Sequence, residues 1–205
     1  MPVLGRTKQD VLSEFRSSEI LEAARRVFAK KGFSQATVEE IAEAAEVAKG
    51  TVYLYFPSKR AIYLAALRHG IEALFEQAKG RLAAAATTEK KLQAFIETRI
   101  EYFDENRDFF KIYYSELANI FTFPNQLDAS LQLLYSKQAK MLEAVLKEGI
   151  QRGEIRPLAT GPTAYAIYDL IRGVIARRLL DGSKTSGPDE TAFLLDLVWK
   201  GIEKR

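Results

Sequence analysis

The sequence has no cysteine and a single histidine, His69, among its 205 residues. Without cysteine, the chain cannot form disulfides, zinc–thiolate sites, iron–sulfur clusters or cysteine nucleophiles. One histidine excludes multi-histidine metal sites and the HExxH motif of zinc proteases. The sequence therefore predicts no metal site and no cofactor.

Long apolar runs and an excess of one charge are also lacking. The sequence has no run of about 18 or more apolar residues, the length that could span a membrane. Its first sixteen residues lack the apolar stretch of a signal peptide. These absences predict a cytoplasmic protein without a membrane partner. Thirty basic and 27 acidic residues leave a net charge of +3, so any DNA binding must come from the local placement of charge.

Strand-like alternation of apolar and polar residues is missing, although hydrophobic residues make up 47% of the chain. Apolar residues recur instead at spacings of three and four, as in Ile20, Ala24, Val27 and Phe28, which is the period of amphipathic helices. The predicted fold class is all-α. Capping residues, glycine and proline predict helices over about 17–31, 48–56, 58–83, 89–105, 109–118 and 125–153. Three further helices are predicted: one begins at 37, one ends at 181 and the last begins at 188.

A helix-turn-helix pattern occupies residues 37–56. Thr37 and Glu40 fit a reciprocal capping box that opens a short helix. A few residues later a second short helix follows. The apolar residues that would hold the two helices together are Ile41, Ala42, Ala45, Val47 and Val52. This arrangement predicts a helix-turn-helix.

The second of these helices carries polar side chains that folding does not need. Lys49 and Tyr53 share one outward face, and Thr51 and Tyr55 share another. Lysine and hydroxyl groups suit phosphate oxygens, and tyrosine rings suit sugars and thymine methyls. The helix is therefore predicted to enter a DNA groove, and Gly50 would allow its close approach to the DNA backbone.

Three segments carry a family pattern. They read Ile20-Leu21-x-Ala23-Ala24-x-x-Val27-Phe28-x-x-x-Gly32-Phe33, Thr37-x-x-x-Ile41-Ala42 and Val47-Ala48-Lys49-Gly50-Thr51-Val52-Tyr53-Leu54-Tyr55-Phe56-Pro57-Ser58-Lys59. In spacing and residue type the chain here resembles the tetracycline-repressor (TetR) family. The match covers about the first sixty residues, and the rest resembles the family only in length and helix order.

The resemblance implies a homodimeric repressor with a DNA-binding head and a larger helical domain that dimerises and binds an inducer. It implies an all-α chain with a flexible arm over 1–16, a three-helix helix-turn-helix domain over 17–62, and a helical ligand-binding and dimerisation domain over 63–205. Matched position by position, DNA contacts would fall on Thr37, Lys49, Gly50, Thr51, Tyr53, Tyr55 and Lys59.

Three neighbouring positions need separate interpretation. Arg60, at a helix N-terminus that attracts phosphate, is either a further DNA contact or a solvated surface residue. Glu46 stands where the family frequently has glycine, which predicts a slightly strained turn. Ala48 stands where members often have serine, which predicts that a capping hydroxyl is missing.

Aromatic residues crowd the chain beyond residue 64. Aromatic side chains at helical spacing are most often core, but several tyrosines in one helical layer also suit a pocket for a small, largely apolar ligand. The candidate ligand-binding residues are Phe95, Tyr102, Phe110, Tyr113, Tyr114, Phe121, Tyr135, Tyr165, Tyr168 and Arg172. The stripe formed by Tyr165, Asp169 and Arg172 could instead form an ion pair within its helix or face a second subunit.

The last two helices each carry a broad apolar stripe, and the resemblance implies a four-helix dimer interface there. The predicted interface residues are Ile167, Ile171, Val174, Ile175, Leu194, Leu197, Val198 and Ile202. Two-fold symmetry would place two recognition helices in successive major grooves of a pseudo-palindromic DNA operator.

The sequence thus predicts a ligand-responsive, sequence-specific DNA-binding transcriptional regulator, a repressor that a small inducer releases from its operator. An enzyme has little support, since no catalytic residues are recognised and the acids Glu97 and Glu101 are typical of a solvated helix face. A helical ligand carrier or adaptor with a vestigial DNA-binding head is the alternative.

Overall fold

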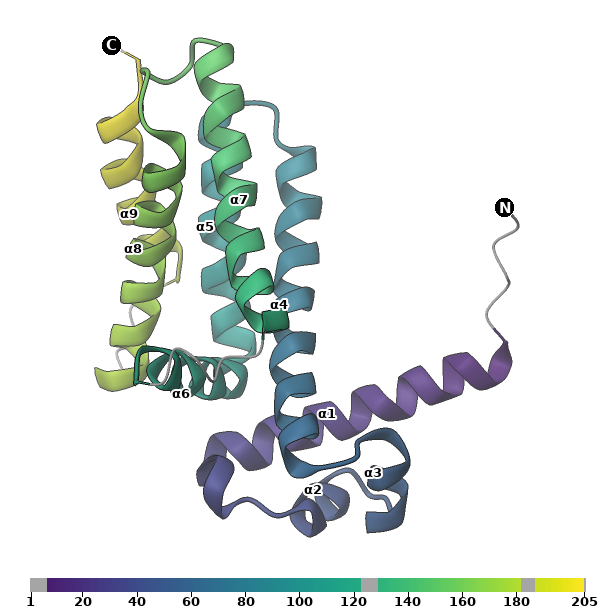
Figure 1. Cartoon of the computed structure of the whole chain (residues 1–205). Helices are drawn as coiled ribbons and strands as arrows, with labels where there is room; N and C mark the ends of the chain where they lie inside the picture. Colours follow the sequence, from purple (N-terminus) through teal and green to yellow (C-terminus); the bar gives the residue numbers. More distant parts are fainter. Residues whose placement is uncertain (1–6, 123–128, 182–186, 205) are drawn as a thin grey trace. The chain divides into compact units, whose positions relative to one another are not determined.

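The computed structural model describes residues 7–122, 129–181 and 187–204, without the side chains of 118–122, 129–132, 135 and 181. These ranges form nine α-helices (Figure 1). The one strand-like feature within them is an isolated bridge between Ile155 and Glu203. The all-α prediction is confirmed. No helix in the described ranges has the length and apolarity needed to cross a membrane.

The helices divide between two compact units. Unit 1 comprises residues 1–70 and 108–115, and unit 2 comprises 71–107 and 116–205. Two helices, α4 and α6, contribute residues to both units. In chain order the helices are α1 (Lys8–Gln35), α2 (Val38–Ala44), α3 (Lys49–Tyr55), α4 (Lys59–Ala84), α5 (Thr88–Glu105), α6 (Arg107–Thr122), α7 (Ala129–Gln151), α8 (Thr160–Asp181) and α9 (Gly187–Ile202).

The core of unit 1 forms where α1 packs against α2 and α3. Ile20 and Phe28 of α1 are buried with Ile41 of α2 and Val52 of α3. The ring of Tyr63 meets that of Phe28 edge-on, with centroids 5.1 Å apart. The apolar period of the sequence therefore marks the packed face of each short helix.

The first helix is longer than expected. It begins at Lys8, so most of the arm predicted to be flexible is helical. Thr7 and Asp10 form a capping box, in which the Asp10 amide donates to Thr7 Oγ1 at 3.2 Å and the Thr7 amide donates to Asp10 Oδ2 at 2.8 Å. Gly32, where the helix was expected to end, interrupts it with φ of 73°, and one more turn follows to Gln35.

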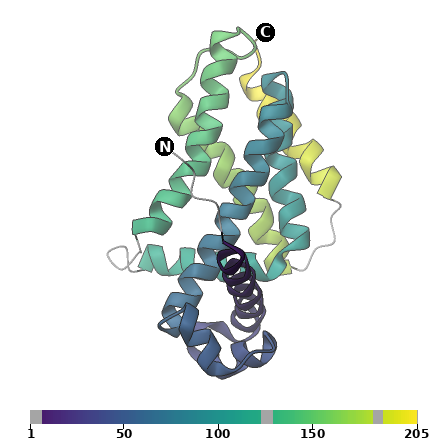
Figure 2. The ribbon, with the colours of Figure 1, turned by 90° about the vertical axis from the view of Figure 1, so that its right-hand side faces the viewer.

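Unit 2 is a helical bundle in which α5 contacts α7, α8 and α9 (Figures 1 and 2). One face of α5 is wholly inside; its buried apolar residues are Leu92, Phe95, Ile96, Ile100, Tyr102 and Phe103. The Thr88 amide, at the start of α5, donates to Glu154 Oε2 at 2.6 Å. This bond holds the pKa of Glu154 below its usual range. The start of α5 is thereby anchored to the chain after α7.

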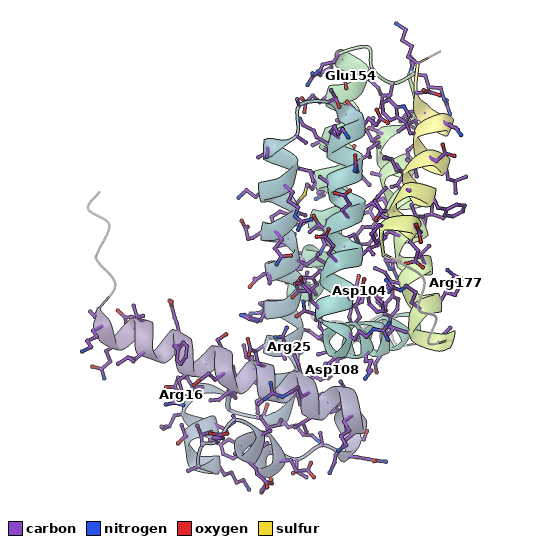
Figure 3. All side chains as sticks on the ribbon, turned by 180° about the vertical axis from the view of Figure 1, so that it is seen from behind. Arg16, Arg25, Asp104, Asp108, Glu154 and Arg177 are labelled. Carbon is purple, nitrogen blue, oxygen red and sulfur yellow. The ribbon has the colours of Figure 1, made fainter. Side chains whose placement is uncertain are left out.

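A partly buried ion cluster joins α5, α8 and α9 in unit 2. Arg178 Nη2 lies 2.6 Å from Asp104 Oδ1, and Arg178 Nη1 lies 3.3 Å from Glu190 Oε2. Arg177 also reaches Glu190, at 3.3 Å. Asp104 and Arg177 lie toward the end of unit 2 opposite Glu154 (Figure 3). Arg178 and Glu190 are buried, Asp104 is exposed, and the two carboxylates balance the charge of Arg178.

Other helix boundaries agree with the sequence within a few residues. Ser58 caps α4 through a 3.1 Å bond from the Ala61 amide to its hydroxyl. The helix predicted over 89–105 is α5, and α6 is longer at both ends than the predicted 109–118. Asn125, expected to cap the next helix, lies outside the described residues.

Candidate functional site

The entry to the helix-turn-helix is fixed by the predicted capping box. The Glu40 amide donates to Thr37 Oγ1 at 3.2 Å, and the Thr37 amide donates to Glu40 Oε2 at 3.1 Å. The Thr37 side chain is therefore used to begin α2 while its surface stays exposed. Its hydroxyl retains acceptor and donor capacity toward a further partner.

The turn between α2 and α3 shows both expected departures from the family pattern. Glu46 has φ of 55°, in the left-handed region that favours glycine. Ala48 caps α3 without any side-chain hydrogen bond. The Val47 amide donates to the Ala42 carbonyl at 3.0 Å, which closes the turn. The strained turn and the missing capping hydroxyl are both confirmed.

The outward surface of α3 carries the polar side chains predicted for it, together with Leu54, which is 84% exposed. Val52 is fully buried, whereas Lys49, Gly50 and Tyr53 are exposed. Lys49 Nζ lies 5.9 Å from the centroid of the Tyr53 ring, which shows that the two side chains share one face. Thr51 is half-buried. This two-turn helix packs on the core through one side. Its other side exposes the cation of Lys49, the phenol of Tyr53 and, at Gly50, backbone without a side chain, which suits a DNA groove.

Lys49 is held by an acidic residue of α2. Its ammonium donates a hydrogen bond to the Glu39 carboxylate. This bond keeps the pKa of Glu39 below its usual range and raises the pKa of Lys49. Both side chains are exposed, so the pair is screened by solvent and a phosphate can displace Glu39. The sequence pattern had not indicated this partner.

Lys59, a predicted DNA contact, is engaged within the chain. Its ammonium donates to the carbonyls of Ser34 at 3.2 Å and Ala36 at 2.9 Å, and lies 4.8 Å from the centroid of the Phe33 ring. These contacts tie the start of α4 to the end of α1. The neighbouring Arg60 is exposed.

Tyr55 turns toward the first helix. It is half-buried, and it lines a shallow hollow with Leu12, Phe15 and Arg16 of α1. The hollow exists because α1 begins at Lys8. Tyr55 therefore lies on the side of α3 that is next to α1.

The predicted ligand-binding residues are distributed over the two units. Phe95, Tyr102 and Tyr168 are buried in unit 2. Phe110 and Tyr113 are buried and Tyr114 is half-buried in unit 1, where their rings pack against one another. The side chains of Phe121 and Tyr135 lie outside the described residues.

Two further predicted ligand residues on α8 differ in burial, since Tyr165 lies on the outer surface and Arg172 is half-buried. Tyr165 is half-exposed, and Arg172 Nη1 pairs with Asp169 Oδ1 at 2.6 Å. Among the three alternatives for this stripe, the ion pair within the helix is the one observed. Tyr165 faces outward, and the side chains of the described residues do not enclose it.

A buried arginine that sequence reasoning missed lies among the aromatic candidates of unit 2. Arg99 of α5 is 1% exposed, and its Cζ lies 4.4 Å from the ring centroid of Tyr168 and 5.9 Å from that of Phe95. Its Nη1 donates to Gln138 Oε1 on α7. The sequence signal that could have revealed this buried arginine is its position within the apolar stripe of its helix, beside Phe95, Ile96 and Ile100.

The predicted dimer stripe is mostly an internal core. Six of its residues are buried within the single chain: Ile167, Ile171, Ile175, Leu194, Val198 and Ile202. They pack inside unit 2 because α7 and α5 cover that face of α8 and α9. Leu197 is 52% exposed, and the outward apolar side chains that the prediction omitted are Leu180 at 89% and Phe193 at 61%.

Comparison with known families matches both parts of the chain. Residues 20–66 match bacterial regulatory proteins of the tetR family, and residues 85–176 match the tetracyclin repressor-like C-terminal domain. The chain belongs to the TetR family of transcriptional regulators. The first match ends within α4 and includes the whole helix-turn-helix.

TetR relatives resemble the chain along most of its length. The HTH-type transcriptional repressor KstR2 of Rhodococcus jostii is 29% identical over 145 residues, covering 68% of this chain and 70% of that protein. The fatty acid metabolism regulator protein of Bacillus subtilis is 29% identical over 190 residues, covering 91% and 95%. The solved structure of FadR from Bacillus subtilis with stearoyl-CoA has a TM-score of 0.75 at 25% identity, covering 91% and 99%.

These findings establish the general activity of the chain. It is a DNA-binding transcriptional regulator with a C-terminal ligand-binding domain. The α2–turn–α3 surface is the part of the fold whose geometry suits DNA.

Proposed function

We propose that this TetR-family chain acts as a homodimeric repressor whose α3 helices occupy successive major grooves of a palindromic operator. Residues 17–62 are assigned to DNA binding and 63–205 to ligand binding and dimerisation. Lys49, Gly50 and Tyr53 form the exposed contact surface, with Thr37, Thr51, Tyr55 and Arg60 at its margins. The polar outer face of α3, built on the single buried Val52, carries the proposal.

The first experiment selects bound sites from a random DNA library with the full chain. Enrichment of one palindromic site, with affinity that falls steeply as salt rises, is expected of a specific dimeric regulator. Weak binding that is indifferent to sequence would contradict the proposal and favour a ligand carrier with a vestigial head.

The double variant Lys49→Ala with Tyr53→Ala then tests the surface itself. Both side chains are exposed, so the fold should survive while operator affinity drops by roughly a hundredfold or more. Lys30→Ala is the matched control, since it removes an exposed lysine of unit 1 from α1. Equal losses in the two proteins would show that bulk charge, and not α3, makes the contact.

The proposed effector is a small, largely apolar molecule that releases the repressor. Of the relatives named above, one is a fatty acid metabolism regulator protein and one solved structure is a complex with stearoyl-CoA. The interior of unit 2 is rich in buried aliphatic and aromatic side chains. The effector shifts the balance between DNA-bound and free states only by its different affinities for them. A gel-shift titration of the operator complex with stearoyl-CoA measures that shift.

The outer faces of α8 and α9 are the proposed dimer interface. Tyr165 and Leu180 lie on one stripe of α8, while Phe193 and Leu197 stand one helical turn apart on α9. Large apolar side chains this exposed are typical of a surface that a partner covers. In this proposal these four side chains form the dimer interface in place of the residues predicted from sequence, most of which are buried within the single chain.

Sedimentation of the double variant Leu180→Glu with Leu197→Glu tests the interface. Wild-type chain is expected as a dimer and the variant as a monomer, because two carboxylates would be buried per subunit. Leu133→Glu is the control, since Leu133 is an exposed leucine of α7. A variant that remains dimeric would place the interface elsewhere.

A further inference from the structure

The buried pair of Arg99 and Gln138 joins α5 to α7 inside unit 2. Arg99 Nη1 donates to Gln138 Oε1, and both side chains are at least 97% buried. Arg99 Nε and Gln138 Nε2 have no hydrogen-bond partner within the part of the chain that the structure describes. Two donors and a positive charge therefore belong to one small polar cluster surrounded by core.

The charge of Arg99 is not balanced by a carboxylate among the described residues. Its contacts there are the neutral amide of Gln138 and the rings of Tyr168 and Phe95. A guanidinium has five N–H donors, and a ring face offers only partial compensation. Burying an unpaired cation is expensive, so such a residue is seldom kept for stability alone.

Arg178 of the same unit shows what a structural buried arginine has. It pairs with Asp104 and Glu190, at 2.6 and 3.3 Å, and lies 4.8 Å from the centroid of the Phe103 ring. The two arginines are buried to a similar degree. They differ in that Arg178 has carboxylate partners and Arg99 has an amide.

We infer that Arg99 and Gln138 bind the oxygen end of an acyl effector, a carboxylate or a thioester carbonyl. The hydrocarbon body of this effector would lie among buried apolar side chains about one helical turn from the pair, which include Phe95 and Ile96 of α5 and Leu142 of α7. The guanidinium fork matches two oxygen acceptors, and the Gln138 amide supplies a further donor. This inference rests on the effector-responsive function proposed above and names the residues that recognise the effector.

Calorimetric titration of the full chain, without DNA, tests the inference with three probes of equal chain length. Octadecanoate carries a carboxylate, stearoyl-CoA carries a thioester carbonyl, and octadecanol carries neither. At least one acyl probe should bind the wild type roughly tenfold or more tightly than octadecanol, because the neutral hydroxyl of octadecanol neither balances the charge of Arg99 nor presents a carbonyl oxygen to the two donors. The acyl probe that binds identifies the form of the effector.

The substitution Arg99→Met should remove this preference. Acyl binding should weaken by roughly tenfold or more, while octadecanol binds as well as or better than it binds the wild type. A merely structural role would weaken all probes alike. Arg81→Met is the matched control, since Arg81 is an exposed arginine of unit 2 that pairs with Glu101.

The double variant Arg99→Met with Gln138→Leu is a second test in case the single variant misfolds. It replaces both members of the pair with apolar side chains, so no lone polar group is left buried. Unchanged acyl binding in either variant, equal losses for all probes, or no binding of either acyl probe to the wild type would overturn the inference. Operator binding is scored separately, so a chain that binds acyl probes but no operator would contradict the proposed repressor and leave the acyl site standing.

Discussion

Gly70 of α4 lies directly against the ring of Phe109 on α6 within unit 1: a Cβ at Gly70 would stand 2.3 Å from Phe109 Cδ2. Non-bonded carbon atoms cannot approach so closely, so any side chain at position 70 must displace the buried ring. The glycine is therefore required by the packing of these two helices.

Gly70→Ala should lower the free energy of unfolding by about 1–3 kcal/mol, as overpacking of a core does. Chemical denaturation measures the loss. Gly80→Ala in the same helix is the control, because a Cβ there meets no atom within 4 Å. That change should stabilise the chain by about 1 kcal/mol through helix propensity. Losses of similar size in both variants would contradict the packing argument.

Glu39→Gln should strengthen DNA binding. The Glu39 carboxylate holds Lys49 and would repel a nearby phosphate, so its neutral amide should raise affinity by roughly two- to fivefold. Glu43→Gln is the control, since this exposed α2 carboxylate loses the same charge at a residue that does not pair with Lys49. Fluorescence anisotropy with operator DNA across a salt series provides the measurement.

Lys49→Ala should also change the salt dependence. Losing one phosphate contact lowers the slope of log affinity against log salt by about 1. If the slope of the variant equals that of the wild type, Lys49 makes no phosphate contact in the complex.

Glu46→Gly should stabilise the chain by about 1 kcal/mol, because a left-handed backbone conformation costs glycine little. Thermal unfolding monitored by circular dichroism measures the gain. Glu43→Gly, a few residues earlier in the helical part of α2, should instead destabilise by about 1 kcal/mol. A loss at position 46 would mean that the Glu46 side chain makes a contribution larger than the strain.

Removing the two buried arginines of unit 2 should affect the free energy of unfolding differently. Arg178→Met leaves Asp104 without its cation and leaves the buried Glu190 with only the exposed Arg177, so it should cost about 3 kcal/mol of stability, the lower end for breaking a buried ion pair. The double variant Arg99→Met with Gln138→Leu should be neutral or more stable, since it leaves no buried group unpaired. Urea unfolding without effector compares them, and a large loss in the double variant would assign Arg99 a structural role.

Local features of the head were predictable from sequence because neighbouring residues decide them. The capping box of Thr37, the strained turn at Glu46 and the exposed pair of Lys49 and Tyr53 each depend on spacings of a few residues. The early start of α1 was missed although Thr7 and Asp10 supply an equally local signal. Its exposed Val11, Leu12 and Phe15 give no buried stripe to recognise.

Contacts between distant segments were not predictable in the same way. The engagement of Lys59 by the carbonyls of Ser34 and Ala36 depends on how α4 meets the end of α1. An apolar period shows that a helix has a packed face, but it does not show whether the same chain or a second subunit covers it. For this reason the stripe of Ile171 and Leu194 was predicted as a dimer surface and is a core.

The sequence by itself determined the all-α class, most helix boundaries and the composition of the recognition helix, because helix period, caps and turns are local properties. The tertiary structure decided which faces of α8 and α9 remain outside, and it brought Arg99 to Gln138 across 39 positions of the chain. Those outcomes depend on how several helices pack at once, and helix packing leaves no signature at a spacing of three or four residues.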